Sequence, residues 1–139
     1  MDATIRKLLV ALSAMMLAIG ELHAAIDFPW LEGQASKALG DPPLTLCERN
    51  LIRAAFSGTT YDCTKLPDAD RVLRAALITW IASSDGNMPR AGRNGIAVGG
   101  AKVVGKLDLS NLKMPYPLAI MKSVIEEEID LSSAEVRAL

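Results

Sequence analysis

Histidine is almost absent from this chain of 139 residues, and aromatic residues make up only 4% of it. The single histidine, His23, lies in an N-terminal segment that we expect to be removed. The remaining chain then has no histidine for a Ser-His-Asp or Cys-His catalytic group, or for a histidine-containing metal site. The net charge of −1 gives no electrostatic case for binding nucleic acid.

The N-terminal segment has the pattern of a secretory signal peptide. Arg6 and Lys7 precede an apolar stretch over residues 8–19, which is too short to span a bilayer comfortably. We expect cleavage after the small residue Ala24, so that residues 1–24 form the signal peptide. An uncleaved anchor is the alternative, and only that anchor would hold the protein at a membrane. Both interpretations place the rest of the chain in the periplasm or outside the bacterial cell.

The chain has two cysteines, Cys47 and Cys63. A cysteine pair in an oxidising compartment is expected to form a disulfide, which would contribute about 3 kcal/mol in the chain-entropy view. Two buried free thiols are the alternative. The spacing is not the C-x-x-C of a redox-active pair.

Two helices are predicted between the signal peptide and the C-terminal third. Thr45 and Glu48 form a capping box for the first helix, and Gly58 ends it. The second helix is predicted from about Asp68 to Ala82 by an apolar stripe that is more typical of a core than of a ligand surface. A polar, glycine-containing linker over residues 83–95 follows.

Residues 95–138 read as one eleven-residue unit written four times. Apolar residues recur at four positions of each unit, with Ser123 as the exception, and the charged residues fall elsewhere. The four columns are Ile96, Leu107, Leu118 and Ile129; Val98, Leu109, Ile120 and Leu131; Ala101, Leu112, Ser123 and Ala134; and Val103, Met114, Ile125 and Val136. These spacings fit neither a helix nor a flat strand, and they predict short inward-facing segments joined by corners, with about two units to a coil.

The predicted fold class is therefore α+β. A helical head with its linker, residues 25–94, is followed by a short pentapeptide-like β-solenoid of about two coils over residues 95–139. A helical last third is the competing interpretation, although Pro115 and Pro117 oppose a helix that begins upstream.

Three motifs in the repeat resemble sites that bind phosphate, bind a cation or catalyse proton transfer. Gly100–Lys106 matches the GxxxxGK of a phosphate-binding loop, but Leu107 replaces the Ser or Thr that would bind Mg²⁺. The run Glu126–Glu128 is more typical of a solvated corner than of a cation site. Asp108 and Asp130 occupy the same outward position of the repeat, which favours solvated carboxylates over an acid–base pair. We identify no catalytic, cofactor-binding or metal-binding residue.

The C-terminal repeat also resembles a known group of proteins. Residues that carry the resemblance are Gly100, Ala101, Val103, Gly105, Leu107, Asp108, Leu109 and Ser110. They are similar to the opening of the pentapeptide-repeat-like β-helix in a family of large, uncharacterised bacterial proteins, where a short helical head also precedes the repeat. The resemblance implies a fold rather than a chemistry, although some relatives carry the label membrane-associated oxidoreductase. Relatives continue for many more coils, whereas this chain stops after about two.

These observations favour a non-catalytic, exported scaffold or protein-interaction module without a cofactor. The last coil, near Leu139, is expected to present an unpaired strand edge and apolar side chains, which predicts self-association or a protein partner there. A small envelope enzyme and a truncated fragment of a longer β-helix protein are the alternatives.

Overall fold

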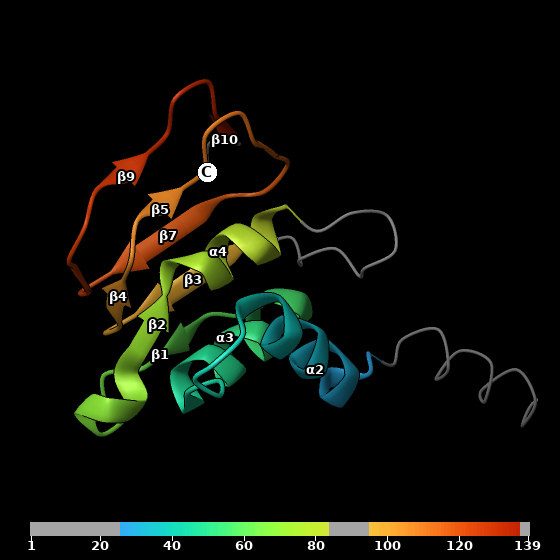
Figure 1. Ribbon diagram of the computed structural model, residues 1–139, viewed down its shortest axis with the longest axis vertical. Helices are drawn as coiled ribbons and strands as arrows, with labels where there is room; N and C mark the ends of the chain where they lie inside the picture. Colours follow the sequence, from blue (N-terminus) through green and yellow to red (C-terminus); the bar gives the residue numbers. More distant parts are fainter. Residues whose placement is uncertain (1–25, 84–94, 137–139) are drawn as a thin grey trace, which may run out of the picture.

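The computed structural model describes residues 26–83 and 95–136. In this part of the chain three helices, α2 (Phe28–Leu39), α3 (Leu46–Ser57) and α4 (Ala75–Ala82), are followed by short parallel strands, as Figure 1 shows. The mixed α+β class is therefore confirmed. The predicted signal peptide, with His23, and most of the predicted linker lie outside the described residues.

Both local predictions for α3 are confirmed. The Thr45 hydroxyl accepts a hydrogen bond from the Glu48 backbone N–H, and the Glu48 carboxylate accepts one from the Thr45 N–H, so the capping box is complete. Gly58 ends the helix in the left-handed conformation, with φ of 73°. Cys47 on α3 forms the predicted disulfide with Cys63, and both residues are fully buried. The bond fastens α3 to the segment that follows it.

The predicted helix over residues 68–82 is wrong in its first half. Asp68–Arg71 form a turn of 3₁₀ helix, and Val72–Arg74 form strand β2. Strand β2 pairs in parallel with strand β4 (Lys102–Val104), with Leu73 beside Val103. A short apolar run fits a strand as well as a helix, and here a strand partner 30 residues later in the chain decides between them.

The strands of the repeat stack in register at intervals of 22 residues, which is two repeat units. Four strands, β3 (Ile96–Gly99), β4, β5 (Leu107–Asp108) and β6 (Lys113–Met114), are followed by β7 (Leu118–Met121), β8 (Val124–Ile125), β9 (Ile129–Asp130) and β10 (Glu135–Val136). Each strand of the first four pairs in parallel with its counterpart in the second four. We call residues 95–116 the first coil and residues 117–136 the second coil.

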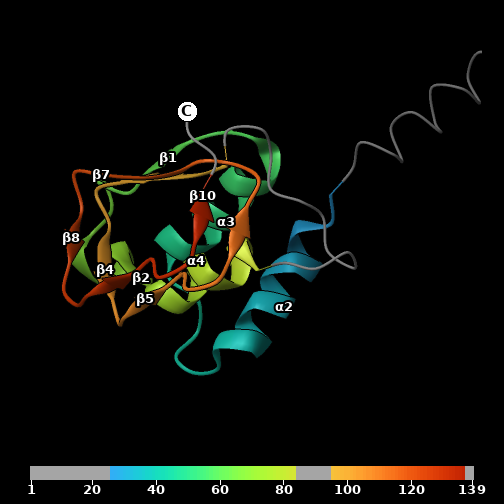
Figure 2. The same cartoon turned by 90° about the horizontal axis from the view of Figure 1, so that it is seen from above.

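The segment before the repeat adds a further layer to the stacked strands. Strand β1 (Tyr61–Asp62) pairs with β3, β2 pairs with β4, and α4 lies against β5. The Thr79 hydroxyl of α4 donates a 3.0 Å hydrogen bond to the Asp108 carbonyl of β5, as a neighbouring strand would. Seen from above, the strands outline the sides of a rectangle, with α3 and α4 beneath it (Figure 2). The head therefore covers one end of the first coil.

Burial of the predicted columns differs between the two coils. In the first coil the column residues are almost all fully enclosed, because the head lies on one side of them and the second coil on the other. Those enclosed residues are Ile96, Val98, Ala101, Val103, Leu107, Leu109 and Met114. Their counterparts in the second coil are half-buried or exposed, and the side chain of Val136 lies outside the described part of the chain. The polar exception, Ser123, is satisfied because its hydroxyl accepts from the Ala101 N–H and donates to the Met121 carbonyl.

Each repeat unit turns one corner through a residue with positive φ. The four corner residues are eleven positions apart: Gly100 (φ 64°), Asn111 (60°), Lys122 (49°) and Ser133 (56°). Glycine and asparagine adopt this conformation readily, whereas most side chains raise its energy. Gly95 and Gly105 also have positive φ, whereas Gly99 lies within β3.

Candidate interaction surface

The edge of the second coil is the main candidate for a functional surface. Within the described residues, β7, β8, β9 and β10 each pair on one side only, with the strand of the first coil below. Their other side carries backbone N–H and C=O groups of the kind that pair with an added strand. Because α3, α4, β1 and β2 occupy the opposite end, the exposed edge lies on one end of the molecule (Figure 1).

Aliphatic side chains are exposed to solvent along this edge. Ile129 and Leu131 are 44% and 54% exposed, whereas their counterparts Leu107 and Leu109 in the first coil are fully buried. The same repeat position is therefore buried when a coil lies above it and exposed when none does. This agrees with the predicted apolar edge of the last coil, although Leu139 itself lies outside the described residues.

The acidic run beside this edge is held by lysines of the first coil. The Lys102 ammonium lies 3.3 Å from the Glu126 carboxylate, and the Lys106 ammonium lies 3.0 Å from Glu128 and 3.8 Å from Asp130. The hydrogen bond to Glu128, with the negative charge of that carboxylate, raises the pKa of Lys106. All three glutamates of the run are exposed, which agrees with the solvated-corner interpretation of Glu126–Glu128.

Asp108 and Asp130 lie one above the other, as the repeat predicts, because β5 and β9 pair at these two residues. Each carboxylate is engaged in its own turn, where it accepts from the backbone N–H two residues ahead: Ser110 for Asp108 and Ser132 for Asp130. The hydrogen bond from the serine hydroxyl is the main reason that the pKa of each aspartate is lowered. Each carboxylate is thus held by its own turn rather than by the other aspartate, which is unsuited to sharing a proton in acid–base catalysis.

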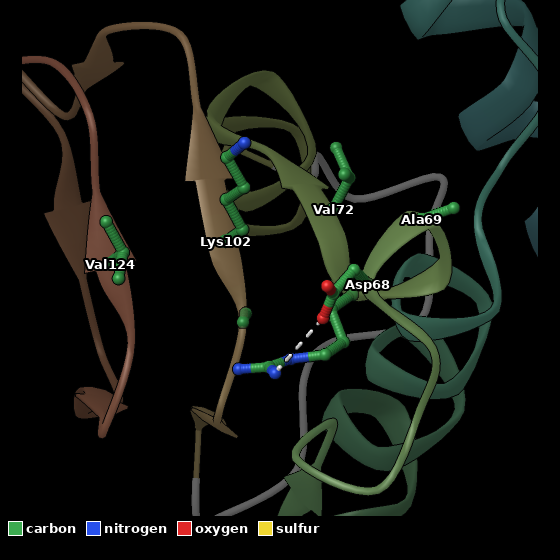
Figure 3. A pocket seen from close by; sticks show the side chains of 7 residues that line it. Asp68, Ala69, Val72, Lys102 and Val124 are labelled. Atoms are coloured by element: carbon green, nitrogen blue, oxygen red, sulfur yellow. Dashed lines mark ion pairs between the residues drawn. The ribbon is translucent and has the colours of Figure 1, made fainter.

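Among the described residues, the outer faces of the sheets carry hollows. One of about 460 Å³ lies outside β2, β4 and β8, lined by residues that include Asp68, Val72, Lys102 and Val124 (Figure 3). At its edge Arg71 donates to the Gly100 carbonyl and lies 3.7 Å from Asp68. The second, of about 220 Å³, lies between β1 and β7. Both lie over sheet faces. Val124 in the larger hollow belongs to the edge strand β8, but it lines the outer face of the sheet with Val72 and Lys102.

The segment that matches a phosphate-binding loop has a different conformation from such a loop. Lys102–Val104 within it form strand β4, which is paired on both sides with β2 and β8. Gly100 closely approaches the backbone of Thr64, and Lys106 is engaged with carboxylates of the second coil. These contacts account for Gly100 and Lys106 by folding alone, and Gly105 has a positive φ that suits glycine.

Neither a metal centre nor a membrane span occurs among the described residues. No group of three or more cysteine, aspartate, glutamate or histidine side chains is arranged to hold a metal ion in residues 26–83 and 95–136. In the same part of the chain, no helix has the length and apolar character needed to cross a membrane.

Comparisons with known proteins add no family. No protein-family model, no curated protein and no solved structure matches this chain.

Helix α2 was not predicted from the sequence, and neither were two further parts of the architecture. The run Tyr61-Asp62-Cys63-Thr64 has the Asp-x-Ser/Thr pattern of the two turns after β5 and β9, and its Asp62 carboxylate accepts from the Thr64 N–H and hydroxyl in the same way. This recurrence was a signal that residues before the linker belong to the stacked strands. The contact between Glu48 and Arg74 had no such signal, because only the folded chain brings the two residues together.

Proposed function

We propose that this protein is a non-catalytic interaction module of the bacterial cell envelope, built as a helical cap on a short pentapeptide-like β-solenoid of about two coils. The 22-residue register of the parallel strands supports the solenoid, and the Cys47–Cys63 disulfide suits an oxidising compartment. The resemblance of the Gly100–Ser110 segment to pentapeptide-repeat-like β-helix proteins points the same way.

The proposed activity is to receive further β-structure on the exposed edge of the second coil. The observation that carries this proposal is the contrast between Leu131, more than half exposed, and its buried counterpart Leu109. A coil laid on this edge would bury Leu131 and Ile129 as the second coil buries Leu109 and Leu107. It would also pair the free side of β7, β8, β9 and β10.

The experiment is a measurement of mass in solution by light scattering over a range of protein concentrations, at about 1 M salt so that charge is screened. We expect concentration-dependent association through the apolar edge. Leu131→Asp should abolish it. Val124→Asp is the matched control, because Val124 is 63% exposed but lies in the larger sheet-face hollow, and association should persist in this variant. A strictly monomeric protein under all these conditions would refute the proposed function.

A further inference from the structure

The two coils carry opposite charge, and this bears on what binds the exposed edge. The first coil has three lysines, Lys102, Lys106 and Lys113, against Asp108, which is a net charge of +2. Over residues 117–136 the second coil has Lys122 against five carboxylates, those of Glu126, Glu127, Glu128, Asp130 and Glu135, which is a net charge of −4, and Arg137, the next residue of the repeat, makes it −3. The exposed edge is therefore apolar along its columns and acidic around its rim.

Within this chain, the first coil already pairs with the acidic rim of the second coil through complementary charge. Lysines of the first coil reach the carboxylates of the second, with Lys102 at 3.3 Å from Glu126 and Lys106 at 3.0 Å from Glu128. The lysine-bearing coil thus stacks on the acidic coil with aliphatic columns aligned and opposite charges paired at the rim. A layer on the other side of the second coil meets the same carboxylates, since Glu126 and Glu128 remain 45% and 73% exposed.

A second copy of this chain is poorly suited to pair with the acidic rim. Its basic first coil is enclosed between its own head and its own second coil, because β1, β2 and α4 lie against β3, β4 and β5. The edge that a second copy can offer is its own second coil, so that two acidic rims would meet, each only partly neutralised by Lys102 and Lys106 of its own first coil. Like charges brought together across an interface disfavour the complex, most strongly at low ionic strength.

From this asymmetry we infer that the physiological partner is another protein that presents a basic β-coil or β-strand, with aliphatic side chains facing the columns and lysine or arginine at the rim, rather than a second copy of this chain. This inference rests on the proposed function and names the chemistry of the partner. The aliphatic columns supply the contact area, and the charge selects the partner.

The test uses three forms of the whole protein that share the same apolar edge. These are the unchanged chain, a neutral variant Glu126→Gln/Glu127→Gln/Glu128→Gln, and a basic variant Glu126→Lys/Glu127→Lys/Glu128→Lys. The basic variant, with a second-coil charge changed from −4 to +2, is the probe for a basic partner. Circular dichroism confirms that each variant is folded. Sedimentation velocity then measures the unchanged chain alone, the neutral variant alone, and an equal mixture of unchanged chain and basic variant, at about 20 mM and about 1 M salt.

At low salt we expect the mixture to associate at least about tenfold more tightly than the unchanged chain associates with itself, with the neutral variant between them. High salt should remove this difference. Equal or tighter self-association of the unchanged chain at low salt would overturn the inference and leave the proposed function standing. Absence of association in every mixture at both salt concentrations would overturn the proposed function, and the inference with it.

Discussion

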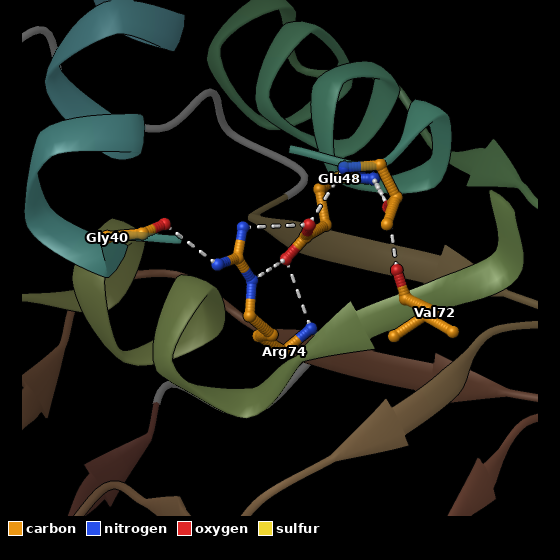
Figure 4. Close-up of polar contacts among 5 residues, drawn as sticks. Gly40, Glu48, Val72 and Arg74 are labelled. Atoms are coloured by element: carbon orange, nitrogen blue, oxygen red, sulfur yellow. Dashed lines mark hydrogen bonds and ion pairs between the residues drawn. The ribbon is translucent and has the colours of Figure 1, made fainter. Parts of the chain in front are cut away.

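Glu48 and Arg74 form an ion pair that joins the helical head to the stacked strands (Figure 4). The Arg74 side chain donates to both carboxylate oxygens of Glu48, from Nε at 2.9 Å and from Nη2 at 3.1 Å, and the Arg74 backbone N–H donates as well. Glu48 is fully buried, and its carboxylate also caps α3 through the Thr45 N–H. The Glu48 side chain therefore caps the N-terminus of α3 and also binds Arg74, the last residue of strand β2.

Removal of one member of this pair should destabilise the fold strongly. Arg74→Met leaves the Glu48 carboxylate buried without its cation, which costs about 3–5 kcal/mol for pairs of this kind. Chemical denaturation monitored by circular dichroism measures the change. The control is Arg53→Met, whose ion pair with Glu32 at 3.0 Å is on the surface, with the Arg53 side chain 55% exposed, and which should cost less than about 1 kcal/mol. Equal losses in the two variants would contradict the proposed role of Glu48 and Arg74.

Gly100 is predicted to tolerate no side chain. Its φ is 64°, and a Cβ there would collide with the Thr64 hydroxyl and lie 2.7 Å from the Thr64 backbone nitrogen. Gly105 has a φ of 85° but no atom within 4 Å of the position that a Cβ would take, so it isolates the conformational effect. We expect Gly105→Ala to cost about 1–2 kcal/mol and Gly100→Ala to cost clearly more, since the backbone at Thr64 must also move. Thermal melts of the two variants give the comparison.

Lys122 offers a stabilising substitution. It occupies the corner that Gly100 and Asn111 occupy in the two preceding units, with φ of 49°. Because asparagine adopts this conformation more readily than lysine, Lys122→Asn should stabilise the protein by about 0.5–1 kcal/mol. Lys113→Asn, in strand β6, is the control and should give no gain. A lower melting temperature for Lys122→Asn than for the unchanged protein would count against this corner assignment.

The disulfide should be a major contribution to stability. It closes a loop between residues 16 positions apart and fastens α3 to the segment beside β1. Cys47→Ala/Cys63→Ala should lose about 3 kcal/mol, because the unfolded chain gains conformational freedom. Urea denaturation with and without a reductant tests this. The reductant should lower the midpoint of the unchanged protein and leave the double variant unaffected.

Stability should vary with pH at both extremes and change little between them. Hydrogen bonds from Thr64, Ser110 and Ser132 lower the pKa values of Asp62, Asp108 and Asp130 in the folded protein. Their contribution is therefore complete above the ordinary aspartate pKa, about 3.9, and is lost as the pH falls through the lowered values. The pKa of Lys106 is raised, so its contribution is complete below about 10.4 and is lost as the pH rises through the raised value.

The measurement for this prediction is the melting temperature from pH 2 to pH 11, where about pH 5–9 should form a plateau. Ser110→Ala/Ser132→Ala removes two of the hydroxyl donors and should reduce the loss on the acid side without changing the alkaline side. An unchanged acid limb in this variant would show that these turns do not control the acid response.

Local features of the sequence were sufficient for several elements. The capping box of Thr45 and Glu48 acts within four residues, so its pattern predicts the start of α3 without knowledge of the rest of the fold. The eleven-residue spacing likewise predicts which side chains of the first coil face inward, because a charge there would be buried without a partner. The repeat also predicts that Asp108 lies beneath Asp130, which the register of β5 and β9 confirms.

The tertiary structure decided those features that depend on partners far away in the chain, namely the conformation of one segment and the exposure of one edge. Val72–Arg74 have an apolar pattern that suits a helix, but β4 supplies strand partners and Glu48 binds the Arg74 N–H, so the segment is extended. The exposed edge has the same origin: Leu109 and Leu131 occupy one repeat position, yet the first is buried and the second is exposed. The sequence alone determined that both are column residues, and only stacking decided which of them remains open, because burial depends on what lies above each coil.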